Sequence, residues 1–179
     1  MLRRFIAIFS ALLIVSAYMP ILFCADPPSV RLEVRDSTRY YMRLKNLKQR
    51  EPNNAEIVYE LANYQYSIEN INEAIREYKR VLEINPEHIN AKYFLSKCLV
   101  RKGYYEDAFW NVRDLLVRDK KNPELYEFAG EILMKMEEYG AAKQYFSKCD
   151  ELVLKKKGNE PLKALTKPHR DEWKKYFYN

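Results

Sequence analysis

Apolar residues between positions 72 and 84 recur at intervals of three and four, which is the spacing of one buried face on an α-helix. This helix is predicted to end at Asn85-Pro86, because proline lacks an N–H group and clashes with the preceding helical turn. A new apolar pattern begins directly after His88. The segment is therefore one period of a pattern that can be followed along the chain.

The pattern returns every 34 residues. Six columns of small or apolar residues keep this period: Ala74, Ala108 and Ala142; Leu61, Leu95 and Ala129; Ala62, Ser96 and Gly130; Tyr78, Val112 and Phe146; Val81, Leu115 and Cys149; and Ile71, Tyr105 and Tyr139. Two helices approach closely only where a side chain is nearly absent, so the small columns are predicted to mark helix crossings. The column that begins with Tyr78 is predicted to fill the gap toward the next unit.

The period and the small-residue columns resemble the tetratricopeptide repeat, a helix–turn–helix unit of this length. The resemblance implies an all-α, right-handed helix–turn–helix solenoid, a superhelix with capping helices at both ends. Three repeats are predicted at 55–156, namely 55–88, 89–122 and 123–156. Before them we predict a signal peptide or membrane anchor at 1–25, and a linker and N-terminal capping helix at 26–54, with the helix at 37–50. A basic, aromatic C-terminal capping segment is predicted at 157–179.

Some positions depart from the family pattern. The first-helix aromatic column reads Val58, Lys92 and Tyr126, so only the third unit fits it well. Lys120 and Leu154 stand where the first unit has Pro86. In the second unit, Asn122-Pro123 is predicted to supply the helix break three residues later.

The first 25 residues predict export. Two arginines precede twenty residues without a charge, FIAIFSALLIVSAYMPILFC, and a helix of that length spans about 30 Å, the thickness of the hydrocarbon layer. Positive charge ahead of the segment holds the N-terminus in the cytoplasm, so the rest of the chain is expected outside it. Three fates stay open: a retained anchor, a cleaved signal, or lipidation of Cys24, which follows a sequence similar to a bacterial lipobox. Each predicts a bacterial protein of the periplasm or another extracytoplasmic space, tethered to the membrane unless the signal is cleaved.

Charge and motifs exclude several classes of function. Residues 55–152 carry 14 basic and 18 acidic side chains, a net charge of −4, which argues against nucleic acid as the partner. His88 and His169 both lie beside proline-containing junctions, and no cysteine or histidine stands at metal-ligand spacing from them. They are therefore predicted to be surface loop residues rather than metal ligands. No phosphate-binding loop or nucleophile motif occurs in the sequence. We therefore expect no enzyme activity, no cofactor, no metal and no small-molecule substrate.

The resemblance implies that the first helices line a concave groove. The residues it assigns to a partner-binding groove are Tyr59, Asn63, Tyr66, Tyr93, Lys97, Arg101, Glu127 and Glu131. The groove would run from tyrosine-rich through basic to acidic, and tyrosine and arginine are typical of binding hot spots. The competing interpretation is that each tyrosine is half-buried packing. The predicted function is a protein–protein interaction adaptor or scaffold that holds an extended peptide or a partner helix, with envelope biogenesis as the setting by analogy with the family.

The C-terminal segment supports an alternative function, that of a peripheral membrane structural element. Its candidate lipid contacts are Trp173, Lys174 and Lys175. Basic residues beside aromatic ones suit anionic headgroups at a membrane surface. A capping helix with a solvated basic face explains the same residues. The sequence leaves the oligomeric state open.

Overall fold

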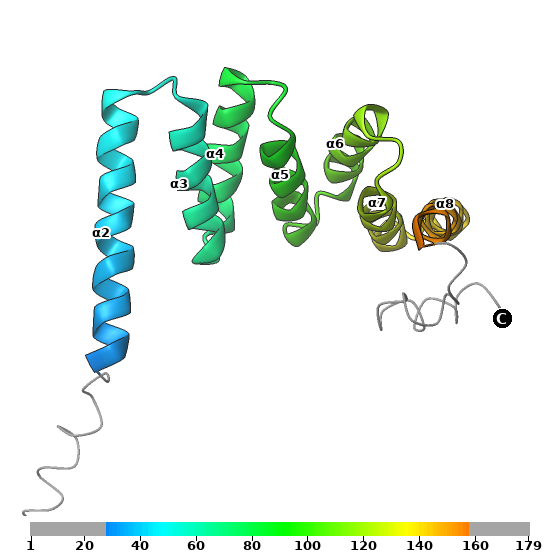
Figure 1. Cartoon of the computed structure of the whole chain (residues 1–179), viewed down its shortest axis with the longest axis horizontal. Helices are drawn as coiled ribbons and strands as arrows, with labels where there is room; N and C mark the ends of the chain where they lie inside the picture. The colour runs from blue at the N-terminus through cyan, green and yellow to red at the C-terminus, as the bar shows by residue number, and fades with distance from the viewer. Residues whose placement is uncertain (1–27, 158–179) are drawn as a thin grey trace, which may run out of the picture. The chain divides into compact units, whose positions relative to one another are not determined.

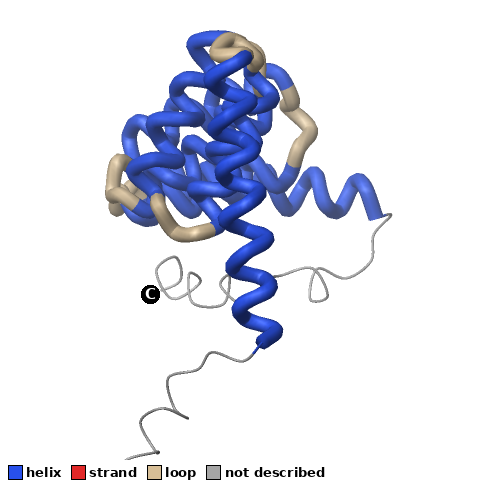
Figure 2. Tube along the Cα trace, turned by 90° about the vertical axis from the view of Figure 1, so that its left-hand side faces the viewer, coloured by secondary structure: helices blue, strands red, loops and turns tan. Residues whose placement is uncertain are grey.

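The chain is all-helical over residues 28–157, the part that the computed structural model describes (Figure 1). Seven helices follow one another in this part without a strand (Figure 2): α2 (Pro28–Arg50), α3 (Ala55–Ser67), α4 (Ile71–Ile84), α5 (Ile89–Arg101), α6 (Tyr105–Arg118), α7 (Pro123–Lys135) and α8 (Tyr139–Lys157). The pairs α3/α4, α5/α6 and α7/α8 pack internally, and α4 and α6 pack on the first helix of the next pair. The predicted all-α helix–turn–helix solenoid is confirmed.

Several predictions fall on other residues. The segment 1–25 with Cys24, His169, and the candidate lipid contacts Trp173, Lys174 and Lys175 lie outside the described residues. Among the helices of residues 28–157, none combines the length and apolar character that a membrane span requires.

The chain divides into two compact units, residues 1–43 and 44–179, and α2 crosses the division. This helix begins at Pro28, upstream of the predicted start at residue 37, and proline is well suited to a first helical turn. Within the second unit, Leu44 is buried and the Lys48 Nζ lies 2.6 Å from a carboxylate oxygen of Glu77 on α4. The end of α2 is therefore fixed to the first repeat.

The helix boundaries themselves have the 34-residue period. Helices α3, α5 and α7 begin at residues 55, 89 and 123, and α4, α6 and α8 begin at 71, 105 and 139. The residue before each first helix caps it with a side chain: Asn54, His88 and Asn122 accept hydrogen bonds from backbone N–H groups of the first turn. The same local chemistry therefore starts each unit.

The turn inside each unit is also periodic. Glu69, Gly103 and Glu137 have positive φ angles of 61°, 80° and 62°. This left-handed conformation suits glycine, which has no Cβ, and is strained for glutamate. Only the second unit has glycine there.

The small-residue columns lie at the helix crossings, as predicted. Ala74, Ala108 and Ala142 are completely buried, and Gly130 is buried against Phe146. A Cβ atom added at Gly130 would lie 2.5 Å from Phe146 Cε1, closer than non-bonded carbon atoms approach. The bulky column is buried beside them and consists of Tyr78, Val112 and Phe146.

The second helices end differently from the prediction. Helix α6 ends at Arg118 without a proline, and Asp119 accepts a hydrogen bond from the Lys121 N–H in the turn that follows. Pro123 is the first residue of α7, so it begins a helix rather than breaking one. Helix α8 continues through Leu154 to Lys157, because no proline or turn residue stops it at the repeat boundary.

Lys92 is a charged residue in the first-helix column of Val58, Lys92 and Tyr126, which departs from the family pattern. Its stem is mostly buried in α5, and its ammonium pairs with Asp114 on α6. Val58, at the same position in the first unit, is fully buried. A long side chain with a buried stem and a paired charge thus replaces an apolar one at this crossing.

We expect Gly130→Ala to lower the free energy of unfolding by about 1–2 kcal/mol, because the new methyl group would displace the buried Phe146 ring. Gly140→Ala is the matched control, since nothing lies within 4 Å of an added Cβ there. The control should keep or raise stability by up to about 1 kcal/mol, through helix propensity. Chemical denaturation followed by circular dichroism measures both. Equal effects would contradict close approach at Gly130.

We expect Glu137→Gly to raise the free energy of unfolding by about 0.5–1 kcal/mol, because it relieves a left-handed glutamate. Glu138→Gly, one residue later, should lower it by about 0.5 kcal/mol, because that residue has no positive φ to relieve. The same denaturation measurement compares the two variants. A stabilising effect of both, or of neither, would contradict the strain at Glu137.

Candidate functional site

The residues assigned to the groove lie on the first helices of the three repeats, which succeed one another in Figure 1. We define the first-helix face by these residues: Tyr59, Asn63 and Tyr66 on α3, Tyr93, Lys97 and Arg101 on α5, and Glu127 and Glu131 on α7. All are partly buried except Arg101, which is exposed. Side chains at such positions can pack against the repeat and still present a surface.

At the α3 end, Asn63 joins two tyrosines. The hydroxyl of the buried Tyr78 donates to Asn63 Oδ1 at 2.8 Å. Burial raises the pKa of the Tyr59 hydroxyl, and a hydrogen bond with Asn63 partly opposes this rise. Asn63 is thus held by the core and by the neighbouring Tyr59.

His88 is not the surface loop residue that the sequence predicted. Its side chain is only 9% exposed, its Nδ1 accepts a hydrogen bond from the Ala91 N–H at 3.1 Å, and its ring centroid lies 4.6 Å from that of Tyr59. His88 Nε2 lies 3.5 Å from a carboxylate oxygen of Glu56. A helix cap and an aromatic contact therefore account for its burial. The signal that sequence reasoning missed is its place in the column of Asn54 and Asn122.

Phe94 on α5 is the centre of the aromatic contacts, and the sequence did not single it out as a site residue. Its ring stacks on Tyr78 at 6.1 Å and meets Tyr66 edge-on at 5.8 Å. Its neighbour Tyr93 contacts both Phe94 and Phe128 of α7 at 5.6 Å. The rings thus form a continuous series from α3 to α7, and offset and edge-to-face contacts of this kind stabilise packing.

Two cations lie over this aromatic series. The Lys97 Nζ is 4.7 Å from the Tyr93 ring centroid and 5.6 Å from that of Phe94. The Arg101 guanidinium lies 5.4 Å from the Tyr66 centroid and also binds Glu69, with N–O distances of 2.5 and 3.1 Å. Both predicted basic residues are therefore positioned by the tyrosines that the sequence assigned to the same groove.

The competing interpretation of the tyrosines holds in part. Tyr66 and Tyr93 each contact a ring from the first helix of the next unit, so these two do pack between units. Tyr59 contacts the rings of Tyr78 and His88 within the first unit. All three tyrosines also remain partly exposed. One set of side chains can therefore join the repeats and present apolar area with polar tips.

The described residues include side chain types that can bind metals or act as nucleophiles. No group of three or more histidine, cysteine, aspartate or glutamate side chains that could hold a metal occurs in residues 28–157. Burial raises the pKa of the Cys98 thiol to about 11, and the charge of Arg101 opposes this only in part. The thiolate, which is the nucleophilic form, is therefore scarce at neutral pH.

The tetratricopeptide repeat family model matches residues 55–88 and 123–152. No curated protein sequence matches the chain. The match at 55–88 coincides with the first predicted unit, and the match at 123–152 lies within the third.

The fold is similar to that of MamA in several solved structures. One, a crystal structure of MamA protein, has 20% identity and a TM-score of 0.63, covering 73% of this chain and 72% of that one. Another, MamA from residue 41 to the end from Desulfovibrio magneticus RS-1, has 19% identity and a TM-score of 0.59, covering 72% and 77%. A third, MamA AMB-1, has 18% identity and a TM-score of 0.63, covering 76% and 73%.

At these identities the likeness concerns the fold alone, and it agrees with the repeated helix starts and with the two matched units. Residues 55–88 and 123–152 are therefore tetratricopeptide repeats, set within an all-helical array of helix pairs.

Proposed function

We propose that this chain is a non-catalytic adaptor that binds an extended peptide or a partner helix on its first-helix face. Its repeats and fold are those of a protein-interaction scaffold. The choice of face rests on the residues that line it. The segment 1–25 would hold this scaffold outside the cytoplasm.

The aromatic series with cations over its rings is the observation that carries the proposal. Tyr66 and Tyr93 are partly exposed, and Arg101 and Lys97 lie against them. A partner that covers these side chains removes large ring areas from water while the polar tips keep hydrogen-bonding capacity. The underlying packing already holds the rings, so little conformational entropy is lost on binding.

The charges on α5 predict which group of a partner would lie against the first-helix face. The Arg101 guanidinium is neutralised by Glu69, whereas Lys97 has no ion pair among the described residues. Lys97 therefore supplies the positive charge at α5, and the partner would place a carboxylate opposite it.

A photoreactive amino acid at Asn90 tests the binding face. Asn90 is exposed in the first turn of α5, and it lies on the same side of this helix as Tyr93 and Lys97, three and seven residues later. Illumination of cells should therefore join this position covalently to a partner bound on the first-helix face. The same probe at Lys79, an exposed position on α4, is the control and should give no such adduct. Lys97→Glu should lower the adduct yield at Asn90 by about tenfold, because it reverses the charge that attracts the carboxylate.

Circular dichroism of the Lys97→Glu protein separates lost binding from lost folding. An unchanged helical spectrum with a reduced adduct supports the proposal. Equal adducts from Asn90 and Lys79, or an adduct at Asn90 that Lys97→Glu leaves unchanged, would refute the first-helix face as the binding surface.

The location is tested by fusing alkaline phosphatase, which is active only after export, behind residue 179 and expressing the fusion in bacteria. We expect full activity from the complete chain and at least a tenfold loss when residues 1–25 are deleted, because the apolar segment directs export. The mass of the mature N-terminus in the wild type and in Cys24→Ser distinguishes anchor, cleavage and lipidation. Activity that persists without residues 1–25 would contradict the proposed export signal.

A further inference from the structure

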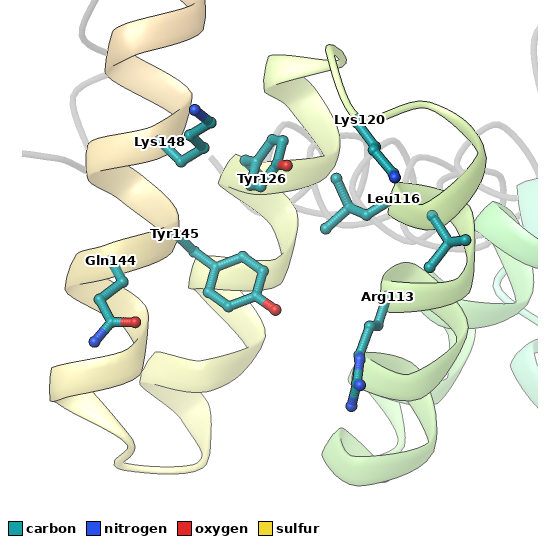
Figure 3. Close-up of a pocket in the computed structure, with 8 residues that line it drawn as sticks. Arg113, Leu116, Lys120, Tyr126, Gln144, Tyr145 and Lys148 are labelled. Carbon is teal, nitrogen blue, oxygen red and sulfur yellow. The ribbon is translucent and has the colours of Figure 1, made fainter.

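A pocket of about 310 Å³ opens between α6 and α8, on residues that the first-helix face does not include (Figure 3). Arg113, Leu116 and Val117 come from α6, Lys120 from the following turn, Tyr126 from α7, and Gln144, Tyr145 and Lys148 from α8. The pocket is thus built by the second helices of two successive repeats, together with one tyrosine of the intervening first helix. Its volume is at the small end of the range for ligand sites.

The apolar part of the pocket is held in place by the core. Tyr145 projects from α8 toward α6 in Figure 3, and its ring contacts Phe109 at 5.7 Å and Tyr126 at 6.0 Å. Leu116 is buried, whereas Val117 is 64% exposed. The pocket therefore has a fixed aromatic wall and an apolar rim in contact with solvent, a combination that suits one apolar side chain of a ligand.

The polar part of the pocket is positive. Arg113, Lys120 and Lys148 line it, and none of its lining residues is acidic. Within residues 37–155, neither Arg113 nor Lys120 forms an ion pair; Arg113 lies 4.8 Å from the ring centroid of Trp110, which is 60% exposed. Two cations therefore face solvent beside the apolar wall without a carboxylate to neutralise them.

Lys148 keeps part of its charge available as well. It lies 2.7 Å from Glu151, and the same carboxylate lies 2.6 Å from Lys155. The hydrogen bonds from the two ammonium groups lower the pKa of Glu151 to about 2, so one negative charge is shared between two positive ones at neutral pH. This corner of the pocket retains a net positive charge.

We propose that this pocket is a second binding site, which takes a short acidic peptide segment with an aromatic side chain between its carboxylates. The ring would lie against Tyr145 and Val117, and the carboxylates would reach Arg113 and Lys120. A long polyanion such as nucleic acid fits less well, because residues 55–152 carry a net charge of −4 and would repel it beyond the pocket. The site is separate from the first-helix face, so the adaptor could hold two partners.

The test uses the full chain in a neutral detergent and a fluorescein-labelled peptide, Asp-Glu-Phe-Asp-Glu, with binding measured by fluorescence anisotropy. Arg113→Glu and Lys120→Glu should each weaken binding by about tenfold, because each removes a charge-assisted hydrogen bond and adds repulsion. Lys79→Glu makes the same change of net charge on α4 and should leave the affinity unchanged. Circular dichroism checks that the variants are folded.

Four results would overturn the proposal. The first is a peptide affinity that Arg113→Glu and Lys120→Glu do not lower, and the second is equal binding of the neutral peptide Asn-Gln-Phe-Asn-Gln. The third is equal competition by a DNA oligonucleotide of the same charge, which would indicate a general anion site. The fourth is a loss of binding in Lys97→Glu with no loss in the pocket variants, which would place the peptide on the first-helix face and leave the proposed function intact.

Discussion

The rest of this structure depends on close contact between helices at positions where the side chain is very small. Ala74, Ala108 and Ala142 are completely buried at corresponding positions, and Gly130 accommodates the Phe146 ring. Dispersion contacts fall away steeply with distance, so an additional methyl group at a crossing would separate the helices along much of their length. The helix pairs therefore repeat with one geometry, and the same columns of side chains face the same direction in every unit.

The aromatic side chains that pack between units are the same ones that we propose to contact a partner. Phe94 joins Tyr78 and Tyr66, and Tyr93 continues the contacts to Phe128. Tyr78 and Phe128 are buried in the core, whereas Tyr66, Tyr93 and Phe94 remain partly exposed beside Lys97 and Arg101. Substitution of a tyrosine here would alter stability and binding together, whereas charge reversal at Lys97 acts mainly on binding.

The sequence predicted most of the fold, because the 34-residue spacing of small residues reflects a physical requirement of helix crossing. It placed Asn63, Tyr66 and Arg101 on a face where the structure does bring rings and charges together. Proline, however, was not needed to end α6, since a turn with an aspartate hydrogen bond follows Arg118 instead. Different residue types can end a helix, so the absence of one expected type does not show that the helix continues.

Other features could not be predicted because they depend on side chains that are far apart in sequence meeting in space. His88 is buried by a cap and by Tyr59, although its neighbours in sequence suggested an exposed loop. The pocket between α6 and α8 combines Arg113, Tyr126 and Lys148, which share no column of the repeat. Periodicity identifies what all units have in common, whereas such a site arises from the differences between them.

The uninterrupted course of α8 gives the third unit a longer second helix than the first two units have. In the first two units the second helix stops at Ile84 or Arg118, and the chain reverses to start another hairpin. Helix α8 passes through Leu154, where that reversal would occur, and reaches Lys157. The last five residues of α8, 153–157, have no counterpart in α4 or α6, so they lengthen the second helix of the third unit by more than one turn. Lys155 on this extension pairs with Glu151 one turn earlier, which is the order of charges that an α-helix favours.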